Sequence, residues 1–96
     1  MTSMRYLRVG DVVELLVHCL GNEPGTNGVV VEEYELGGHG VMVIFPNGEY
    51  DGFSEDEQLN FLQFVRHDER MESYVFTNVM QLSRDFQDKL FTFTKG

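Results

Sequence analysis

The tripeptide Pro46-Asn47-Gly48 separates an apolar run, residues 41–45 (VMVIF), from residues 49–53 (EYDGF). Asn-Gly is the preferred pair for a two-residue hairpin turn, because both of its positions tolerate positive φ angles. Pro46 suits the end of the first strand, where no ladder hydrogen bond is lost. The sequence therefore predicts an antiparallel hairpin, and residues 41–45 should form a central strand because they are apolar throughout.

A first strand is predicted at residues 12–17 (VVELLV), where Val13, Leu15 and Val17 share one face and Glu14 lies on the other. We expect this strand at an edge or rim of the sheet. The next ten residues (HCLGNEPGTN) contain two Gly, two Asn and a Pro, a composition that predicts a loop.

A second strand is predicted at residues 29–36, although three consecutive valines precede Glu32, Glu33 and Glu35 and break the alternation. A β-bulge or strong bend would reconcile the two halves of this strand. Residues 37–40 (GGHG) can adopt the positive φ angles of a tight connection to residues 41–45.

A helix is predicted to begin at Ser54, because Ser54-Glu55-Asp56-Glu57 has the S-x-x-E form of a capping box. Three acids in its first turn also suit the positive end of a helix dipole. Residues 59–65 fit two alternatives equally well: a continued helix face, or a helical turn followed by a strand.

After a charged turn at residues 66–72, residues 74–76 (YVF) are predicted to form another short strand. Thr77 or Asn78 could then cap a short C-terminal helix. The apolar residues at helical spacing in that helix are Val79, Leu82, Phe86 and Leu90.

The segment GVVVE from Gly28, together with residues 41–53, resembles the core hairpins of SH3-like barrels of the KOW type. The resemblance covers roughly the first sixty residues and is a pattern of Gly and apolar positions. It implies a mainly β fold with short helices (α+β): a small, partly open barrel of about five strands, with a short helix after the fourth strand and a C-terminal helical segment. We expect residues 1–96 to form a single domain. Related barrels in ribosomal and transcription proteins bind RNA or protein through basic or aromatic loops.

Charge argues against the RNA-binding form of such a barrel. Residues 9–65 contain no Lys or Arg but eleven carboxylates, and the whole chain has a net charge of -9. A surface of this kind repels nucleic acids and anionic membranes and attracts basic proteins or cations. We therefore expect no direct nucleic-acid binding and no membrane association.

The leading hypothesis is a small acidic accessory or binding module that recognises a basic protein surface. An alternative is a nucleic-acid mimic of the phage inhibitor type, because clustered carboxylates can imitate the field of a duplex. A further alternative is an acidic surface that serves solubility alone. The candidate partner-binding residues are the acids Glu32, Glu33, Glu35, Glu49, Asp51, Glu55, Asp56 and Glu57.

Cys19 is the single cysteine, so an intramolecular disulfide is excluded. The lack of disulfides and the lack of an apolar leader in MTSMRYLRVG together favour a cytoplasmic location. An enzyme that uses Cys19 beside His18 is disfavoured, because neighbours on an extended segment point apart and acidic or apolar surroundings raise a thiol pKa. The acids at residues 49–57 do not have the spacing of a calcium-binding loop. We expect no metal site, no cofactor and no enzymatic activity.

Seven aromatic residues could instead form a groove for Pro-rich peptides, although most are expected in the core. They are Tyr34, Tyr50, Phe53, Phe61, Phe64, Tyr74 and Phe76.

Overall fold

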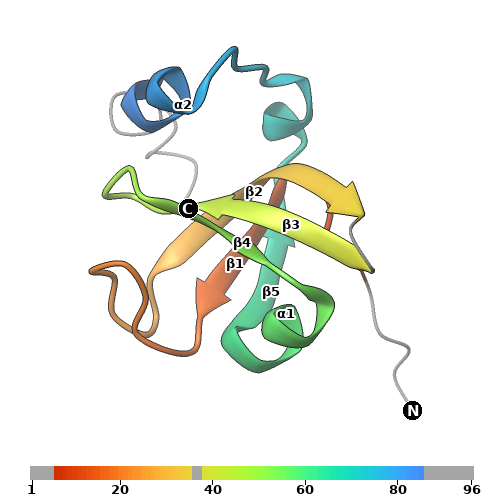
Figure 1. Cartoon of the computed structure of the whole chain (residues 1–96), viewed down its shortest axis with the longest axis vertical. Helices are drawn as coiled ribbons and strands as arrows, with labels where there is room; N and C mark the ends of the chain where they lie inside the picture. Colours follow the sequence, from red (N-terminus) through yellow and green to blue (C-terminus); the bar gives the residue numbers. More distant parts are fainter. Residues whose placement is uncertain (1–5, 36–37, 86–96) are drawn as a thin grey trace.

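The computed structural model describes residues 6–35 and 38–85, which form an antiparallel five-stranded sheet that is not closed into a barrel. The strand order is β4-β3-β2-β1-β5 (Figure 1). The strands are β1 (Asp11–Leu15), β2 (Asn27–Glu35), β3 (His39–Ile44), β4 (Tyr50–Phe53) and β5 (Leu62–His67). The helical segments are α1 (Glu55–Phe61), the 3-10 helix η1 (Glu69–Ser73) and α2 (Val79–Asp85). The expected mainly β fold, with a short helix after the fourth strand and another near the C-terminus, is confirmed.

The first strand is not at an edge, so that expectation was wrong. β1 lies between β2 and β5, and Val12 pairs with Val29 on one side and Arg66 on the other. Val13 and Leu15 do share one buried face, as their alternation predicted. β3 lies between β2 and β4, while the middle position of the sheet belongs to β2.

The β3–β4 hairpin is present, but its connection has three residues rather than two. The Gly48 N–H donates to the Phe45 carbonyl (2.8 Å), and the Phe45 N–H donates to the Glu49 carbonyl (2.9 Å). Gly48 has a φ of 86°, whereas Asn47 is not among the described residues with positive φ. This is the arrangement in which a left-handed Gly follows an ordinary turn and matches the twist of the strands.

β2 contains the bulge that its valines predicted. The register to β3 shifts between Val30, which pairs with Val43, and Glu32, which pairs with Met42. Val30 packs in the cluster on one face of the sheet, while Val29 and Val31 pack in the cluster on the other. The run of valines is therefore apolar because both faces of this half of β2 are covered.

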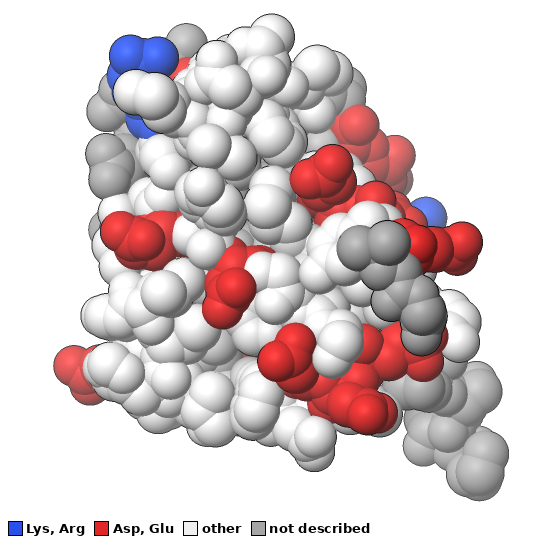
Figure 2. Space-filling view, viewed as in Figure 1, with Lys and Arg blue, Asp and Glu red and all other residues white. Residues whose placement is uncertain are grey.

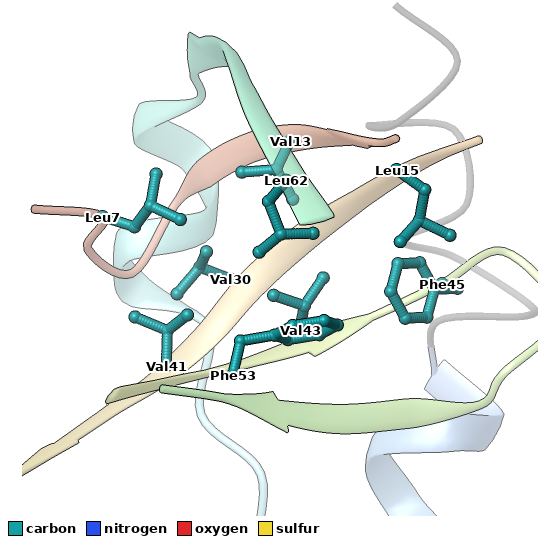
Figure 3. Close-up of a cluster of buried hydrophobic side chains, with 9 residues drawn as sticks. All are labelled: Leu7, Val13, Leu15, Val30, Val41, Val43, Phe45, Phe53 and Leu62. Carbon is teal, nitrogen blue, oxygen red and sulfur yellow. The ribbon is translucent and has the colours of Figure 1, made fainter. Parts of the chain in front are cut away.

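The inner face of the curved sheet encloses the main hydrophobic cluster (Figure 3). Phe45 and Phe53 meet edge to face in this cluster, with ring centroids 6.4 Å apart. Gly28 is required beside them, because a Cβ there would stand 2.7 Å from the Phe45 ring. The cluster consists of Leu7, Val13, Leu15, Val30, Val41, Val43, Phe45, Phe53 and Leu62.

A second cluster forms on the outer face, where η1 and α2 lie on the side of the strands opposite to α1 (Figure 1). Met71 of η1 and Leu82 of α2 cover Val12, Val29, Val31 and Ile44. Residues 74–76 have no regular secondary structure, so the strand predicted there was wrong. The backbone of this segment instead links the two helices that cover the outer face.

Both helices begin with the side-chain caps that the sequence indicates. Ser54 accepts a hydrogen bond from the Glu57 N–H while the Glu57 carboxylate accepts one from the Ser54 N–H, which completes the capping box. Asn78 accepts from the Gln81 N–H at the start of α2. Of the alternatives for residues 59–65, the helical turn followed by a strand is correct. Phe86 and Leu90 of the predicted C-terminal helix lie outside the described residues.

Candidate functional site

The first turn of α1 is fastened to the start of β3, which brings distant acids together. The Glu55 carboxylate accepts a hydrogen bond from the His39 N–H (2.7 Å). The buried Gln58 amide donates to the carbonyls of His39 (2.9 Å) and Phe53 (3.0 Å). Since Glu35 pairs with His39 across β2 and β3, the end of β2 adjoins the N-terminal turn of α1.

An open hollow of about 310 Å³ lies at this junction, and we call it the acidic hollow. Tyr34 forms one of its walls, and a Cβ at Gly40 would stand only 2.3 Å from the Tyr34 ring. A second, adjoining hollow brings in Glu35 and Tyr6. The residues that line the acidic hollow are Tyr34, Gly38, His39, Gly40, Ser54, Glu55, Asp56 and Glu57.

Four of the eight predicted partner-binding acids accept hydrogen bonds from backbone N–H groups. Glu55 bonds to His39 and Glu57 completes the capping box. Glu33 accepts from the Val9 N–H (2.9 Å), and Asp51 accepts from the Gly52 N–H (2.8 Å). For the other four, no side-chain hydrogen bond to another described residue is present. These are Glu32, Glu35, Glu49 and Asp56.

The eight acids do not share a single face. Glu32 pairs with Met42, which packs on the outer cluster, whereas Glu33 pairs with Val41 of the inner cluster. Glu49 lies in the β3–β4 hairpin, away from the acidic hollow. Figure 2 accordingly shows carboxylate groups in separate patches, with uncharged surface between them. The structure brings together the acids of α1 and the end of β2 and leaves the others apart.

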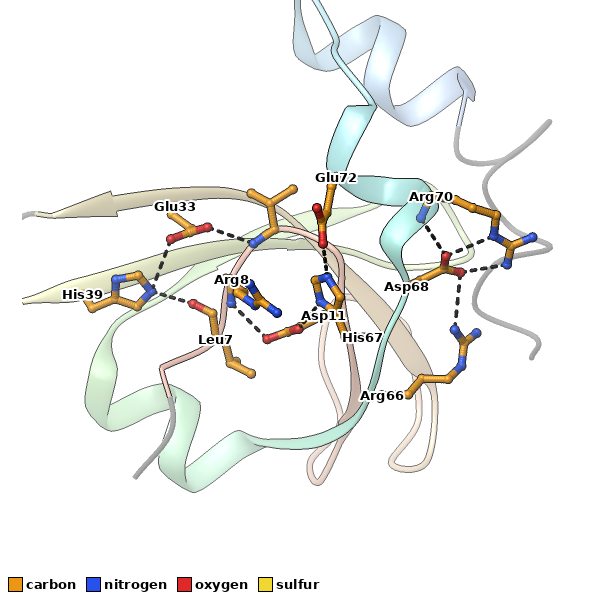
Figure 4. Close-up of polar contacts among 11 residues, drawn as sticks. Leu7, Arg8, Asp11, Glu33, His39, Arg66, His67, Asp68, Arg70 and Glu72 are labelled. Carbon is orange, nitrogen blue, oxygen red and sulfur yellow. Dashed lines mark hydrogen bonds and ion pairs between the residues drawn. The ribbon is translucent and has the colours of Figure 1, made fainter. Parts of the chain in front are cut away.

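Within residues 6–35 and 38–85, no Lys or Arg forms an ion pair with any of the eight acids. Arg66 and Arg70 bind Asp68 instead, at 3.3 Å and 2.8 Å (Figure 4). These guanidinium groups, chiefly that of Arg70, hold the pKa of the Asp68 carboxyl well below its usual range. The His39 Nε2–H donates to the Leu7 carbonyl (2.6 Å) and lies 4.0 Å from Glu33.

Cys19 has the structural surroundings expected of it. It is partly buried against the inner cluster, and its backbone forms two hydrogen bonds with Asn22 (2.9 Å and 2.8 Å). Burial raises the pKa of the Cys19 thiol, and the carboxylate of Asp51 raises it further. His18 is exposed. The raised pKa disfavours the thiolate that nucleophilic chemistry requires.

A polar cluster that the sequence reasoning missed joins Asp11, His67 and Glu72. The His67 Nδ1 lies 2.6 Å from the Asp11 carboxylate, and its Nε2 contacts the Glu72 carboxylate (Figure 4). The sequence contains no local signal for the first contact, because Asp11 and His67 are 56 positions apart.

The seven candidate aromatic residues do not form one groove. Phe53 is in the inner cluster, and Tyr34 lines the acidic hollow. Tyr74 and Phe76 stack on the outer face, with ring centroids 6.0 Å apart. Tyr50 and Met80 both line a separate, mostly apolar hollow. Most of these residues do belong to the core, as expected, because four of the seven lie in or against the two hydrophobic clusters. Phe53 is buried, and Phe61, Tyr74 and Phe76 are partly buried. Phe64 and Tyr50 are exposed.

Comparison with protein families, curated proteins and solved structures finds no match to this chain. Within the described part of the chain, no cluster of three or more His, Cys, Asp or Glu residues has the geometry to hold a metal ion. No helix among the same residues is long and apolar enough to cross a membrane.

Proposed function

We propose that this protein is a small acidic binding module that recognises a basic segment on the surface of another protein. The observation that carries the proposal is the acidic hollow. There Glu55 and Asp56 of α1 line the same hollow as Tyr34, and Glu35 of β2 lines the adjoining hollow. No described Lys or Arg pairs with these three acids.

The chemistry of the hollow favours a cationic side chain. A Lys or Arg placed over the face of Tyr34 would gain about 0.5–1 kcal/mol from the cation–π interaction at a partly exposed site. Each ion pair with a surrounding carboxylate adds roughly 0.2–1 kcal/mol at an exposed position. A volume of about 310 Å³ suits one side chain of a partner. The remaining affinity would come from other cations of the same segment that lie on neighbouring acids.

Charge variants test this proposal most sharply where the carboxylate has no structural task. Glu35 and Asp56 are exposed, and neither forms a side-chain hydrogen bond with another described residue. The double variant Glu35→Gln/Asp56→Asn removes one charge from the acidic hollow and one from the adjoining hollow. The double variant Glu23→Gln/Glu49→Gln removes the same charge at two exposed residues that line neither hollow, and it is the matched control.

The probe is a fluorescent peptide of alternating Arg and Gly, titrated at low and at physiological ionic strength. We expect the hollow variant to bind about tenfold more weakly, which corresponds to ~1.4 kcal/mol, and the control variant to bind nearly as well as the wild type. Equal losses in both variants would show that net charge alone attracts the peptide and would overturn the assignment to the hollow.

A pull-down from native lysate at low and high salt, followed by mass spectrometry, identifies the natural partner. The proposal expects a basic protein whose capture weakens as salt screens the carboxylates. Duplex DNA added in competition separates this function from nucleic-acid mimicry. A partner released by DNA would favour the mimic, whereas one retained in its presence supports recognition of a basic segment.

A further inference from the structure

His67 connects the sheet to the segment that covers its outer face. Its Nδ1 lies 2.6 Å from Asp11, a fully buried residue at the start of β1, and its Nε2 contacts Glu72 of η1. The ring also packs closely against Gly10, where an added Cβ would stand 2.8 Å from the His67 Cε1. Figure 4 shows the imidazole held between the two carboxylates, one from each element.

The protonation state follows from the partners of the ring. An ionised carboxylate only accepts hydrogen bonds, so each ring nitrogen must carry a proton to bond with its own carboxylate. A neutral imidazole has one N–H and satisfies only one of them. The observed geometry, with Asp11 and Glu72 on opposite nitrogens, is therefore that of an imidazolium.

We propose that His67 is a proton-dependent clasp that holds η1 against the sheet. When the imidazolium loses a proton, the contact with Glu72 opens before the contact with Asp11. The reason is burial: Asp11 has no access to solvent, while the Glu72 side chain is 50% exposed and can bond to water instead.

The charges around His67 favour its protonated form. Hydrogen bonds to Glu72 and then to Asp11 raise the pKa of His67 above its ordinary value of 6.5, and burial and the charge of Arg8 oppose the rise only in part. A group whose pKa is raised in the closed state stabilises that state fully below the pKa of the open state. The clasp therefore holds below about pH 6.5 and weakens as the pH rises through the raised pKa of His67.

Opening of the clasp would uncover apolar surface. Met71 of η1 is 1% exposed and packs on Val12, Val29 and Val31. The hydrogen bonds that report on η1 are those from the Met71 N–H to Asp68 (3.1 Å) and from the Tyr74 N–H to Met71 (3.2 Å). The proton on His67 thus controls access to the outer face of the sheet.

Two measurements on the full chain test the clasp. NMR titration of the histidine ring signals gives the pKa of His67 in the wild type and in Glu72→Gln. Hydrogen exchange, expressed as protection factors, gives the stability of the Met71 and Tyr74 amides from pH 6 to pH 9. We expect the pKa of His67 to be lower in Glu72→Gln than in the wild type. Between pH 6 and pH 9, the protection factors of the wild-type Met71 and Tyr74 amides should fall tenfold for each unit by which Glu72 raises the pKa of His67.

His67→Gln is the variant that removes the titrating group. The protection factors of its Met71 and Tyr74 amides should be equal at pH 6 and pH 9. His18→Gln, an exposed histidine in a loop, is the matched control and should behave as the wild type. A His67 pKa at or below 6.5, or protection that falls equally with pH in wild type and His67→Gln, overturns the proposal. If His67→Gln does not fold, the same protection profile in Glu72→Gln and wild type overturns it.

Discussion

The ring of Tyr34 lies against the backbone of Gly40, so that a Cβ at this glycine would stand 2.3 Å from Tyr34 Cε2. The tyrosine hydroxyl reaches on to Gly52 of β4, where a Cβ would stand 2.6 Å away. Two glycines on neighbouring strands thus make room for one ring. This contact sets the position of the aromatic wall of the acidic hollow.

Substitution Gly40→Ala should destabilise the protein by about 1–2 kcal/mol, because the added methyl group displaces the Tyr34 ring. Urea unfolding measures the loss. The control is a double-mutant cycle with Tyr34→Ala, since removal of the ring should relieve most of the cost of the methyl group. Additive costs in the double variant would show that Tyr34 is not the reason for glycine at position 40.

Substitution Gln58→Met should cost about 2 kcal/mol of unfolding free energy. Methionine has a similar length, but it leaves the carbonyls of His39 and Phe53 without the donor that Gln58 supplies. The exposed Gln63 offers the same change as a control, and Gln63→Met should alter stability by less than about 0.5 kcal/mol. Similar losses in the two variants would contradict the role given to Gln58.

Substitution Asp68→Asn should lower the free energy of unfolding by about 1–3 kcal/mol at neutral pH, because the charge-assisted hydrogen bonds from Arg70 and Arg66 are lost. Asparagine can still cap η1 by accepting from the Arg70 N–H. The pKa of Asp68 is depressed in the folded state, so its stabilisation is present above the ordinary value of 3.8 and is lost only at lower pH. Urea unfolding across acidic pH should show the wild-type advantage persisting to pH 3.8. Loss of that advantage well above pH 3.8 would contradict the pairing.

The ultraviolet titration of the tyrosines should contain one step at about pH 12, and Tyr74→Phe should remove it. Burial, together with the hydrogen bond from the Tyr74 hydroxyl to Asp85 (3.1 Å), raises the pKa of Tyr74 to about 12. The folded state therefore favours neutral Tyr74, and the stabilisation from this group fades as the pH rises above 10.0. A late step that survives in Tyr74→Phe would assign it to another tyrosine.

Features with local causes could be predicted from the sequence. The capping box needs only Ser54 and Glu57, and the hairpin needs only the turn residues and the apolar run before Pro46. The bulge at Val31 followed from a break in alternation within one strand. Each of these depends on residues a few positions apart, whose geometry the backbone itself determines.

Features that depend on distant partners could not be predicted. The strand predicted at residues 74–76 has the right composition, but β1 pairs with residues 62–67 instead. The acids of the candidate site were predicted from charge alone, which does not indicate which of them lie close together. That follows from the hydrogen bond between His39 and Glu55, which joins the start of β3 to α1. The contact between Asp11 and His67 joins the start of one strand to the end of another, and nothing in either neighbourhood indicates it.

The two hydrophobic clusters also imply an order of assembly on the ribosome. Every described residue of the inner cluster lies between Leu7 and Leu62, whereas the outer cluster needs Met71 and Leu82. A nascent chain that has emerged only as far as β5 already contains all five strands and every described residue of the inner cluster. The segment that carries η1 and α2 would then cover a sheet that is already complete, and until it emerges the outer valines would be exposed to chaperones.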